Sequence, residues 1–253
     1  MLLTACKTLR NAGITPLAFG NKEALKALVI ARSFRHALSG DAETFFTTLG
    51  EDSECLENVL AEGLSFLALL RDCGYLDVTV FSELNAERSP AALFENGKSP
   101  FMIGGIWISP RLARQRPGLW FRVFPLPVRE SGGIAVLGLD TPLAVNKGGK
   151  HLRQAFDLVK SMTEPDATRV FNDDQGLFSP LKNARPKDSA VHPLWDCMNT
   201  GKAVFHSDVR LRHPIWKALD AGVEMILSGA SGEEAAKKVA RLLLTEEKGA
   251  SAS

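Results

Sequence analysis

The chain has 253 residues, of which 45% are hydrophobic, and its formal net charge at pH 7 is +1. This composition allows a buried core and excludes wholesale disorder. The near-zero charge provides no basic surface of the kind that binds nucleic acid or an anionic membrane. Since no apolar run approaches the roughly 20 residues that cross a bilayer, we expect no membrane-spanning segment.

Hydrophobic periodicity and cap signals predict a mixed α/β chain. The clearest amphipathic helix runs from Cys55 to Asp72 and carries leucines along one face. A Ser-x-x-Glu sequence at Ser231 predicts a capping box at the start of the last helix. The other expected helices are, in chain order, 2–12, 22–38, 41–49, 91–96, 150–162, 165–171, 190–199 and 214–227. The expected strands are 14–19, 101–103, 119–126, 134–139 and 143–145, and the prolines at 125 and 127 are expected to stop sheet pairing.

The stretch from Ala91 to Trp107 contains the most informative pattern. It reads as a short helix ending at Asn96-Gly97, a buried strand at 101–103, and a turn at Gly104-Gly105 followed by Trp107. A flat indole beside a glycine-lined gap suits the stacking of a sugar ring. We therefore expect Trp107, Gly104 and Gly105 to bind ligand, while a core tryptophan at a strand end is the alternative interpretation.

This stretch also resembles a signature of extracellular solute-binding protein family 1, the sugar-binding components of ABC importers that are similar to maltose-binding protein. The matching residues are Phe94, Gly97, Lys98, Met102, Gly105 and Trp107. Pro100 departs from the pattern, since alanine is usual at that position. Further phrases occur in the order typical of the family, at 5–20, 69–76, 124–127, 143–147 and 176–181.

The resemblance implies a periplasmic-binding-protein type II fold, in which two α/β lobes hold ligand between them. It covers mainly the C-terminal lobe, which would comprise residues 1–131 and 177–253. Residues 132–176 would be a return segment that completes the N-terminal lobe, the rest of which is missing from the chain. We therefore expect an N-terminally truncated family member, and Met1 is followed by no signal peptide pattern.

By the same resemblance, the expected function is extracytoplasmic binding of a sugar or oligosaccharide for an ABC transporter. The protein would act at the periplasmic or extracellular face, lipid-anchored or soluble, and its partners would be the importer's permease subunits. We expect binding to be impaired in a chain that lacks half of the ligand cleft. The alternatives are a non-transporting fragment, a decayed gene product, or a lobe that needs a separate partner chain.

Other ligand-binding candidates lie in two loops and one helix start. Trp216 would be a second stacking aromatic, with a core position as an equal alternative. Asn21 and Glu23 follow the first strand and could bond sugar hydroxyls, although helix capping is the favoured interpretation. Arg210 and Arg212 carry forked guanidinium groups that suit paired hydroxyls, but a solvated charged loop is favoured there.

We expect no enzymatic activity, no metal and no cofactor. Ser179 and Lys182 match S-x-x-K, but they lie in an expected linker and lack the companion motifs. Asp173-Asp174 are adjacent in an expected turn, which suits an acid/base pair poorly. The five histidines lack metal-ligand spacing, and the four cysteines, without a C-x-x-C, are expected to be free thiols. We interpret Trp120 and Trp195 as structural.

Overall fold

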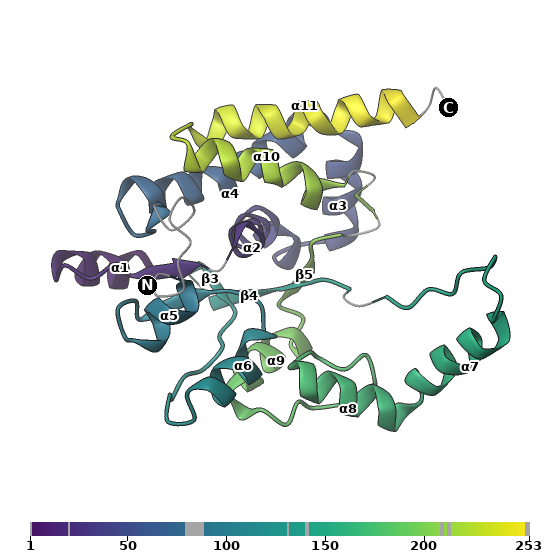
Figure 1. Cartoon of the computed structure of the whole chain (residues 1–253). Coiled ribbons are helices and arrows are strands. Elements are labelled where there is room, and N and C mark those ends of the chain that lie inside the picture. The colour runs from purple at the N-terminus through teal and green to yellow at the C-terminus, as the bar shows by residue number, and fades with distance from the viewer. Residues whose placement is uncertain are drawn as a thin grey trace. The chain divides into compact units, whose positions relative to one another are not determined.

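The computed structural model describes residues 2–19, 21–78, 89–130, 132–139, 142–207, 210–211 and 214–250 (Figure 1). The chain divides into two compact units. Unit 1 comprises Met1–Gly105, Pro125–Leu137 and Cys197–Ser253, and unit 2 comprises Ile106–Phe124 and Gly138–Asp196.

The elements of unit 1 are α1 (Leu2–Asn11), β1 (Leu17–Phe19), α2 (Lys22–Ser33), η1 (Phe34–Leu38), α3 (Ala42–Glu51), α4 (Ser53–Asp72), α5 (Pro90–Glu95), β2 (Phe101–Ile103), β3 (Leu126–Arg129), β4 (Gly132–Leu137), β5 (Ala203–Phe205), α10 (Ile215–Leu227) and α11 (Gly232–Ala250). The elements of unit 2 are α6 (Ile108–Gln115), α7 (Leu152–Met162), α8 (Pro165–Gln175) and η4 (Ser189–Val191). Helix α9 (His192–Asn199) begins in unit 2 and ends in unit 1.

Helix α4 forms the centre of the core of unit 1. Its predicted leucine face is buried, and α2 and α11 pack against it, with α10 beside α11 (Figure 1). Gly63 allows the close approach of α4 to α2, because an added Cβ would lie 2.4 Å from Ser33 Oγ and 2.5 Å from the backbone oxygen of Val29. At such distances a side chain would force the helices apart.

Two small sheets complete unit 1. Strands β1 and β2 pair in parallel, with Phe19 opposite Ile103. In the second sheet β4 lies between β3, its antiparallel neighbour, and β5, its parallel neighbour. Strand β1 is completely buried. Strand β2, which was expected to be a buried strand, is not: its Ile103 is buried, but its Phe101 is 42% exposed.

Several predicted features are confirmed. Gly97 closes α5 with a φ of 67°. At the start of α11 the Ser231 Oγ accepts a hydrogen bond from the backbone N–H of Glu234 at 3.2 Å, and the Glu234 carboxylate accepts one from the Ser231 N–H at 3.0 Å. All four cysteines are free thiols.

Two predicted strands are wrong. Residues 119–125 form no strand, and Trp120 is 82% exposed. The strand in this region is β3, which begins at Leu126 and includes Pro127. Proline is tolerated there because β3 is the outer strand of its sheet and can lack one N–H donor. The expected strand at 143–145 is irregular chain.

Helix α6, which follows Trp107 directly, was not predicted. Its third residue is Pro110, and proline in a sequence indicates a break more often than a helix. In the first helical turn, however, backbone N–H groups have no intrahelical acceptor, so the ring is accommodated without loss. Gly176 ends α8 with a φ of 67° and lies against Pro110, since an added Cβ would be 2.4 Å from Pro110 Cγ.

Unit 2 leaves many apolar side chains uncovered. All residues of α7 are described and none is buried, and Asn172 is the buried residue of α8. The exposed apolar side chains of these helices are Phe156, Leu158, Met162, Val170 and Phe171.

In the part of the chain that the structure describes, no helix has both the length and the apolar character that a bilayer span requires.

The bounds of the compact units differ from those of the predicted lobes. Unit 2 contains residues 138–176 of the predicted return segment, and it also contains 106–124 and 177–196. The correspondence between these units and the lobes of a two-lobed fold stays a prediction.

Candidate functional site

Four predicted site residues lie at one edge of the β1–β2 pair in unit 1. Because the strands are parallel and Phe19 pairs with Ile103, their carboxyl ends meet at the same edge. Asn21 and Glu23 follow β1 there, and Gly104 and Gly105 follow β2. Crevices at the carboxyl ends of parallel strands are the usual ligand sites of open α/β sheets.

Asn21 and Glu23 both belong to the start of α2. The Asn21 Oδ1 accepts a hydrogen bond from the Ala24 N–H at 3.0 Å, which is the capping role that the sequence favoured. The Glu23 Oε1 lies 2.8 Å from the Nζ of Lys26, one helical turn further on. The Glu23 side chain is 45% exposed, so it keeps acceptor capacity on its solvent side.

Lys26 connects these residues to Trp216. Its side chain is 2% exposed, its Nζ lies 2.8 Å from the Asp220 Oδ1 of α10, and the same Nζ is 4.6 Å from the centroid of the Trp216 ring. A buried ammonium is tolerated because two carboxylates and an aromatic face replace its hydration. We name Glu23, Lys26, Trp216 and Asp220 the Lys26 cluster.

Lys26 and Asp220 were not among the predicted site residues. The Glu23–Lys26 spacing of three residues in a helix is a signal that was available in the sequence, since such side chains are neighbours on the helix surface. The burial of the lysine depends on α10, which lies far away in the sequence, and no local pattern indicates it.

Trp216 lies in the first turn of α10 and is partly buried against the core. The imidazole of His206 is stacked on its indole, with ring centroids 4.2 Å apart and planes inclined by 28°. His206 follows β5, and its N–H donates to the Leu137 carbonyl at 3.0 Å. Burial lowers the pKa of His206; Glu23 opposes this shift and Lys26 adds to it. The imidazole is therefore neutral at neutral pH.

The two predicted arginines have different outcomes. The guanidinium carbon of Arg210 lies 4.7 Å from the ring centroid of Phe46, which places this arginine against α3. Arg210 also lies near Asp41, whose pKa is lowered mainly by its hydrogen bond to the Thr44 hydroxyl. Arg212 lies outside the described residues.

Trp107 belongs to unit 2 and follows the glycine pair by two residues. It immediately precedes α6 and is 52% exposed. About half of the surface of Trp107 is therefore open to solvent. Trp107 lies in unit 2 and Trp216 lies in unit 1, so the surroundings of each tryptophan are described only within its own unit.

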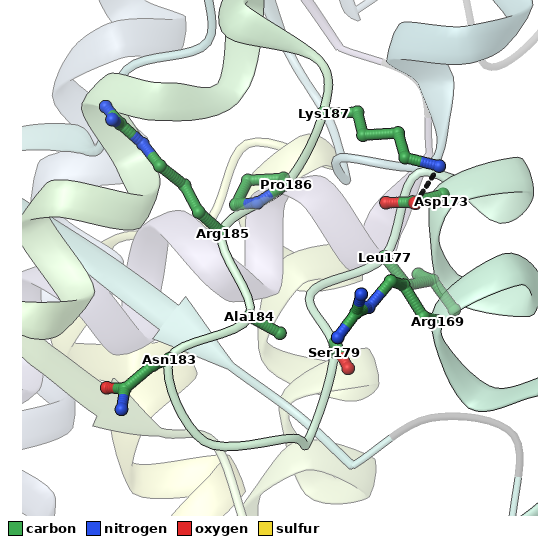
Figure 2. A pocket seen from close by; sticks show the side chains of 9 residues that line it. All are labelled: Arg169, Asp173, Leu177, Ser179, Asn183, Ala184, Arg185, Pro186 and Lys187. Carbon is green, nitrogen blue, oxygen red and sulfur yellow. Dashed lines mark ion pairs between the residues drawn. The ribbon is translucent and has the colours of Figure 1, made fainter. Parts of the chain in front are cut away.

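Unit 2 also contains a cavity of about 290 Å³ between α8 and the chain that follows it (Figure 2). Its lining residues are Arg169, Asp173, Leu177, Ser179, Asn183, Ala184, Arg185, Pro186 and Lys187. Figure 2 shows Asp173 joined to Lys187, whose Nζ lies 2.9 Å from the Asp173 Oδ2. Asp173 is thus held in an ion pair. In the described ranges, no group of three or more His, Cys, Asp or Glu side chains could hold a metal ion.

Residues 19–195 match the family described as bacterial extracellular solute-binding protein. Over 111 residues the chain is 32% identical to the multiple sugar-binding protein of Streptococcus mutans, which corresponds to 43% of this chain and 26% of that protein. This family consists of binding proteins and not of enzymes, in agreement with the predicted absence of catalysis.

Solved structures show the same fold. A binding protein of Bacillus subtilis in an open conformation matches with a TM-score of 0.72 and 15% identity, over 98% of this chain and 64% of that one. A sugar transporter of Bacillus licheniformis in complex with stachyose matches with a TM-score of 0.72 and 15% identity, over 96% of this chain and 64% of that one.

These matches confirm the predicted α/β periplasmic-binding-protein class, and the chain spans about 64% of the length of the two solved structures. That share is consistent with part of a two-lobed fold. The family match covers most of the chain and includes Asn21, Glu23, Lys26 and the glycine pair, but it ends before His206, Trp216 and Asp220. The chain therefore belongs to the bacterial extracellular solute-binding protein family.

Proposed function

We propose that this chain supplies the sugar- or oligosaccharide-binding surface of a solute-binding protein that serves an ABC importer. The protein would act at the periplasmic or extracellular face and pass its ligand to the importer's permease subunits. The observation that carries this proposal is the edge at which β1 and β2 end, because Glu23 of the Lys26 cluster follows one strand there and the glycine pair follows the other. The multiple sugar-binding protein of Streptococcus mutans and the stachyose complex support the same ligand class.

In the proposed mechanism, aromatic and polar groups have separate tasks. Trp107 and Trp216 stack against the apolar faces of sugar rings. Glu23, Arg210 and Arg212 bond hydroxyl groups, whereas Asn21 positions its loop by capping α2. Gly104 and Gly105 let the ligand approach the backbone, and closure of two lobes then excludes water from the bound sugar.

We infer that unit 1 corresponds to the larger part of the C-terminal lobe. The residues of unit 2 between 138 and 176 would then belong to the segment that completes the N-terminal lobe. The loop-bearing edge of β1 and β2 supports this assignment, because ligands of open α/β sheets bind outside the carboxyl ends of the strands.

The test is a titration of the purified chain with stachyose and a panel of smaller sugars, followed by tryptophan fluorescence and calorimetry. We expect Trp107→Ala to abolish the saturable response and to leave the free energy of unfolding within about 0.5 kcal/mol of wild type, because the side chain is half exposed. Trp120→Ala is the matched control, since Trp120 is also an exposed tryptophan of unit 2 and should keep the wild-type titration. Wild-type binding by the Trp107 variant would contradict the stacking role.

The second candidate is that this chain does not bind sugar on its own. It would act only together with a further polypeptide that covers unit 2, or it would be a fragment without a transport role. The exposed apolar side chains of α7 and α8 favour it, with Phe156 58%, Leu158 61% and Val170 66% exposed. Apolar patches of this kind mark interaction surfaces in soluble proteins.

This candidate predicts that the purified chain binds a hydrophobic dye or self-associates in light scattering. The double variant Phe156→Glu with Leu158→Glu should reduce both signals, because it places charge at two exposed apolar positions of α7. A monodisperse wild-type monomer that ignores the dye and binds stachyose saturably would exclude the second candidate.

A further inference from the structure

The ring of His206 takes up a position on Trp216 that resembles that of a stacked ligand. The centroids of the two rings are 4.2 Å apart and their planes are inclined by only 28°. A sugar ring that stacks on an indole needs the same parallel contact with the aromatic face. The imidazole and a sugar therefore cannot occupy this face of Trp216 together.

We propose that His206 is a displaceable cap on Trp216, and that a sugar ring can stack on the capped face only after the imidazole has turned away. The proposal rests on the sugar-binding role proposed above for Trp216. It adds a residue that regulates access to the site and that the sequence analysis left without a role.

The platform is fixed from several sides. Trp216 is anchored in α10 and packs against the core of unit 1. Lys26 lies over the same indole and is held by Glu23 and Asp220, each 2.8 Å from its Nζ. A ligand therefore meets a tryptophan whose orientation is already set.

The cap, in contrast, is held locally. The backbone of His206 is fixed by its N–H···O bond to Leu137, which continues the β4–β5 pairing. Its side chain shares a hydrogen bond of 2.6 Å with the hydroxyl of Ser207, its neighbour in the chain, and stacks on the indole. A rotation about the side-chain bonds of His206 uncovers Trp216 without any change in the strand.

In the described part of the chain, the charges that act on the imidazole come from α2 and α10. Glu23 and Lys26 of α2 act on it directly, and Asp220 of α10 pairs with the Lys26 ammonium. Burial opposes a charge on the stacked ring more strongly than Glu23 attracts it, and Lys26 adds to the opposition. The stacked state is thus the state of the neutral ring, and protonation favours release of the cap.

The apparent sugar affinity equals the intrinsic affinity multiplied by the fraction of molecules in which the cap is open. A single aromatic stack corresponds to an equilibrium preference of about 2- to 12-fold. Removing the imidazole should therefore tighten sugar binding by a factor in that range.

The experiment measures accessibility and affinity separately. Acrylamide quenching is recorded with Trp216 as the sole tryptophan, after Trp107, Trp120 and Trp195 are changed to phenylalanine. We expect His206→Ala to raise the quenching constant, and His206→Phe to keep it at the wild-type level because a ring remains stacked. The control His36→Ala removes an imidazole of η1, which is paired with Glu62, and should change nothing.

Affinity is then measured with stachyose in the chain that retains all four tryptophans. His206→Ala should bind about 2- to 12-fold more tightly than wild type, and His206→Phe should show no gain. Equal quenching constants for wild type and a folded His206→Ala variant would overturn the cap, and so would increased quenching with unchanged stachyose affinity. Increased quenching with no stachyose binding by either protein would support the cap as a contact and refute the proposed sugar-binding function.

Discussion

Replacing Lys26 with methionine would remove the charge at the centre of the Lys26 cluster and keep a side chain of similar length. The Lys26 side chain is 2% exposed, and its ammonium nitrogen lies 2.8 Å from carboxylate oxygens of both Glu23 and Asp220. Breaking a fully buried ion pair costs about 3–5 kcal/mol. The two carboxylates are 45% and 47% exposed and can regain water, so we expect a smaller loss of about 1–3 kcal/mol.

Urea unfolding measures this loss as a shift in the extrapolated free energy of unfolding. Lys22→Met is the matched control, because Lys22 is a lysine of the same helix whose partner Glu224 also lies on α10. That pair is exposed on both sides, at 39% and 58%, and should contribute about 0–1 kcal/mol. Equal losses for the two variants would refute the argument that burial makes Lys26 important.

Three further predictions use the same unfolding assays. Gly63→Ala should lower the free energy of unfolding by about 1–3 kcal/mol, because the added Cβ would clash with atoms of α2. The control Gly40→Ala, whose Cβ would have no atom within 4 Å, should be as stable as wild type. The free energy of unfolding should fall as the pH drops below about 6.5. Burial lowers the pKa of His206, so the unfolded chain takes up the proton first. If the free energy of unfolding of His206→Asn fell equally steeply with pH, this explanation would be contradicted. Ser231→Ala should cost about 0.5–2 kcal/mol through loss of the cap of α11, and an unchanged urea midpoint would count against it.

The helices of unit 1 were predictable because their periodicity follows from burial of one face. The leucine face of α4 and the capping box at Ser231 are encoded within a few neighbouring residues. The same holds for Gly97, whose positive φ closes α5. Such features need no knowledge of the rest of the chain.

The errors have a common physical origin. The alternation around Trp120 predicted a strand, but the indole is exposed, and the Arg122 guanidinium lies 5.8 Å from its ring centroid in irregular chain. Alternating residues form a strand only when a partner supplies hydrogen bonds, and that partner is not visible in a local pattern. Helix α6 was missed because Pro110 indicates a break unless the first turn has been located.

The candidate site was predictable in part. Asn21, Glu23, Gly104 and Gly105 were selected from the sequence, and the parallel pairing of β1 with β2 brings them to one edge. Lys26, Asp220 and His206 were not selected, because their roles depend on contacts between elements far apart in the chain. A lysine in a helix is usually solvated, so its burial becomes visible only in the folded structure.

The proline in β3 also affects how copies of this chain can associate. An outer strand normally presents free N–H and C=O groups to which an incoming strand can add. Pro127 removes a donor from β3, and the register shift between Leu126 and Arg129 interrupts the ladder. Extension of the sheet across this edge, which is the route to fibrous aggregates, is therefore disfavoured.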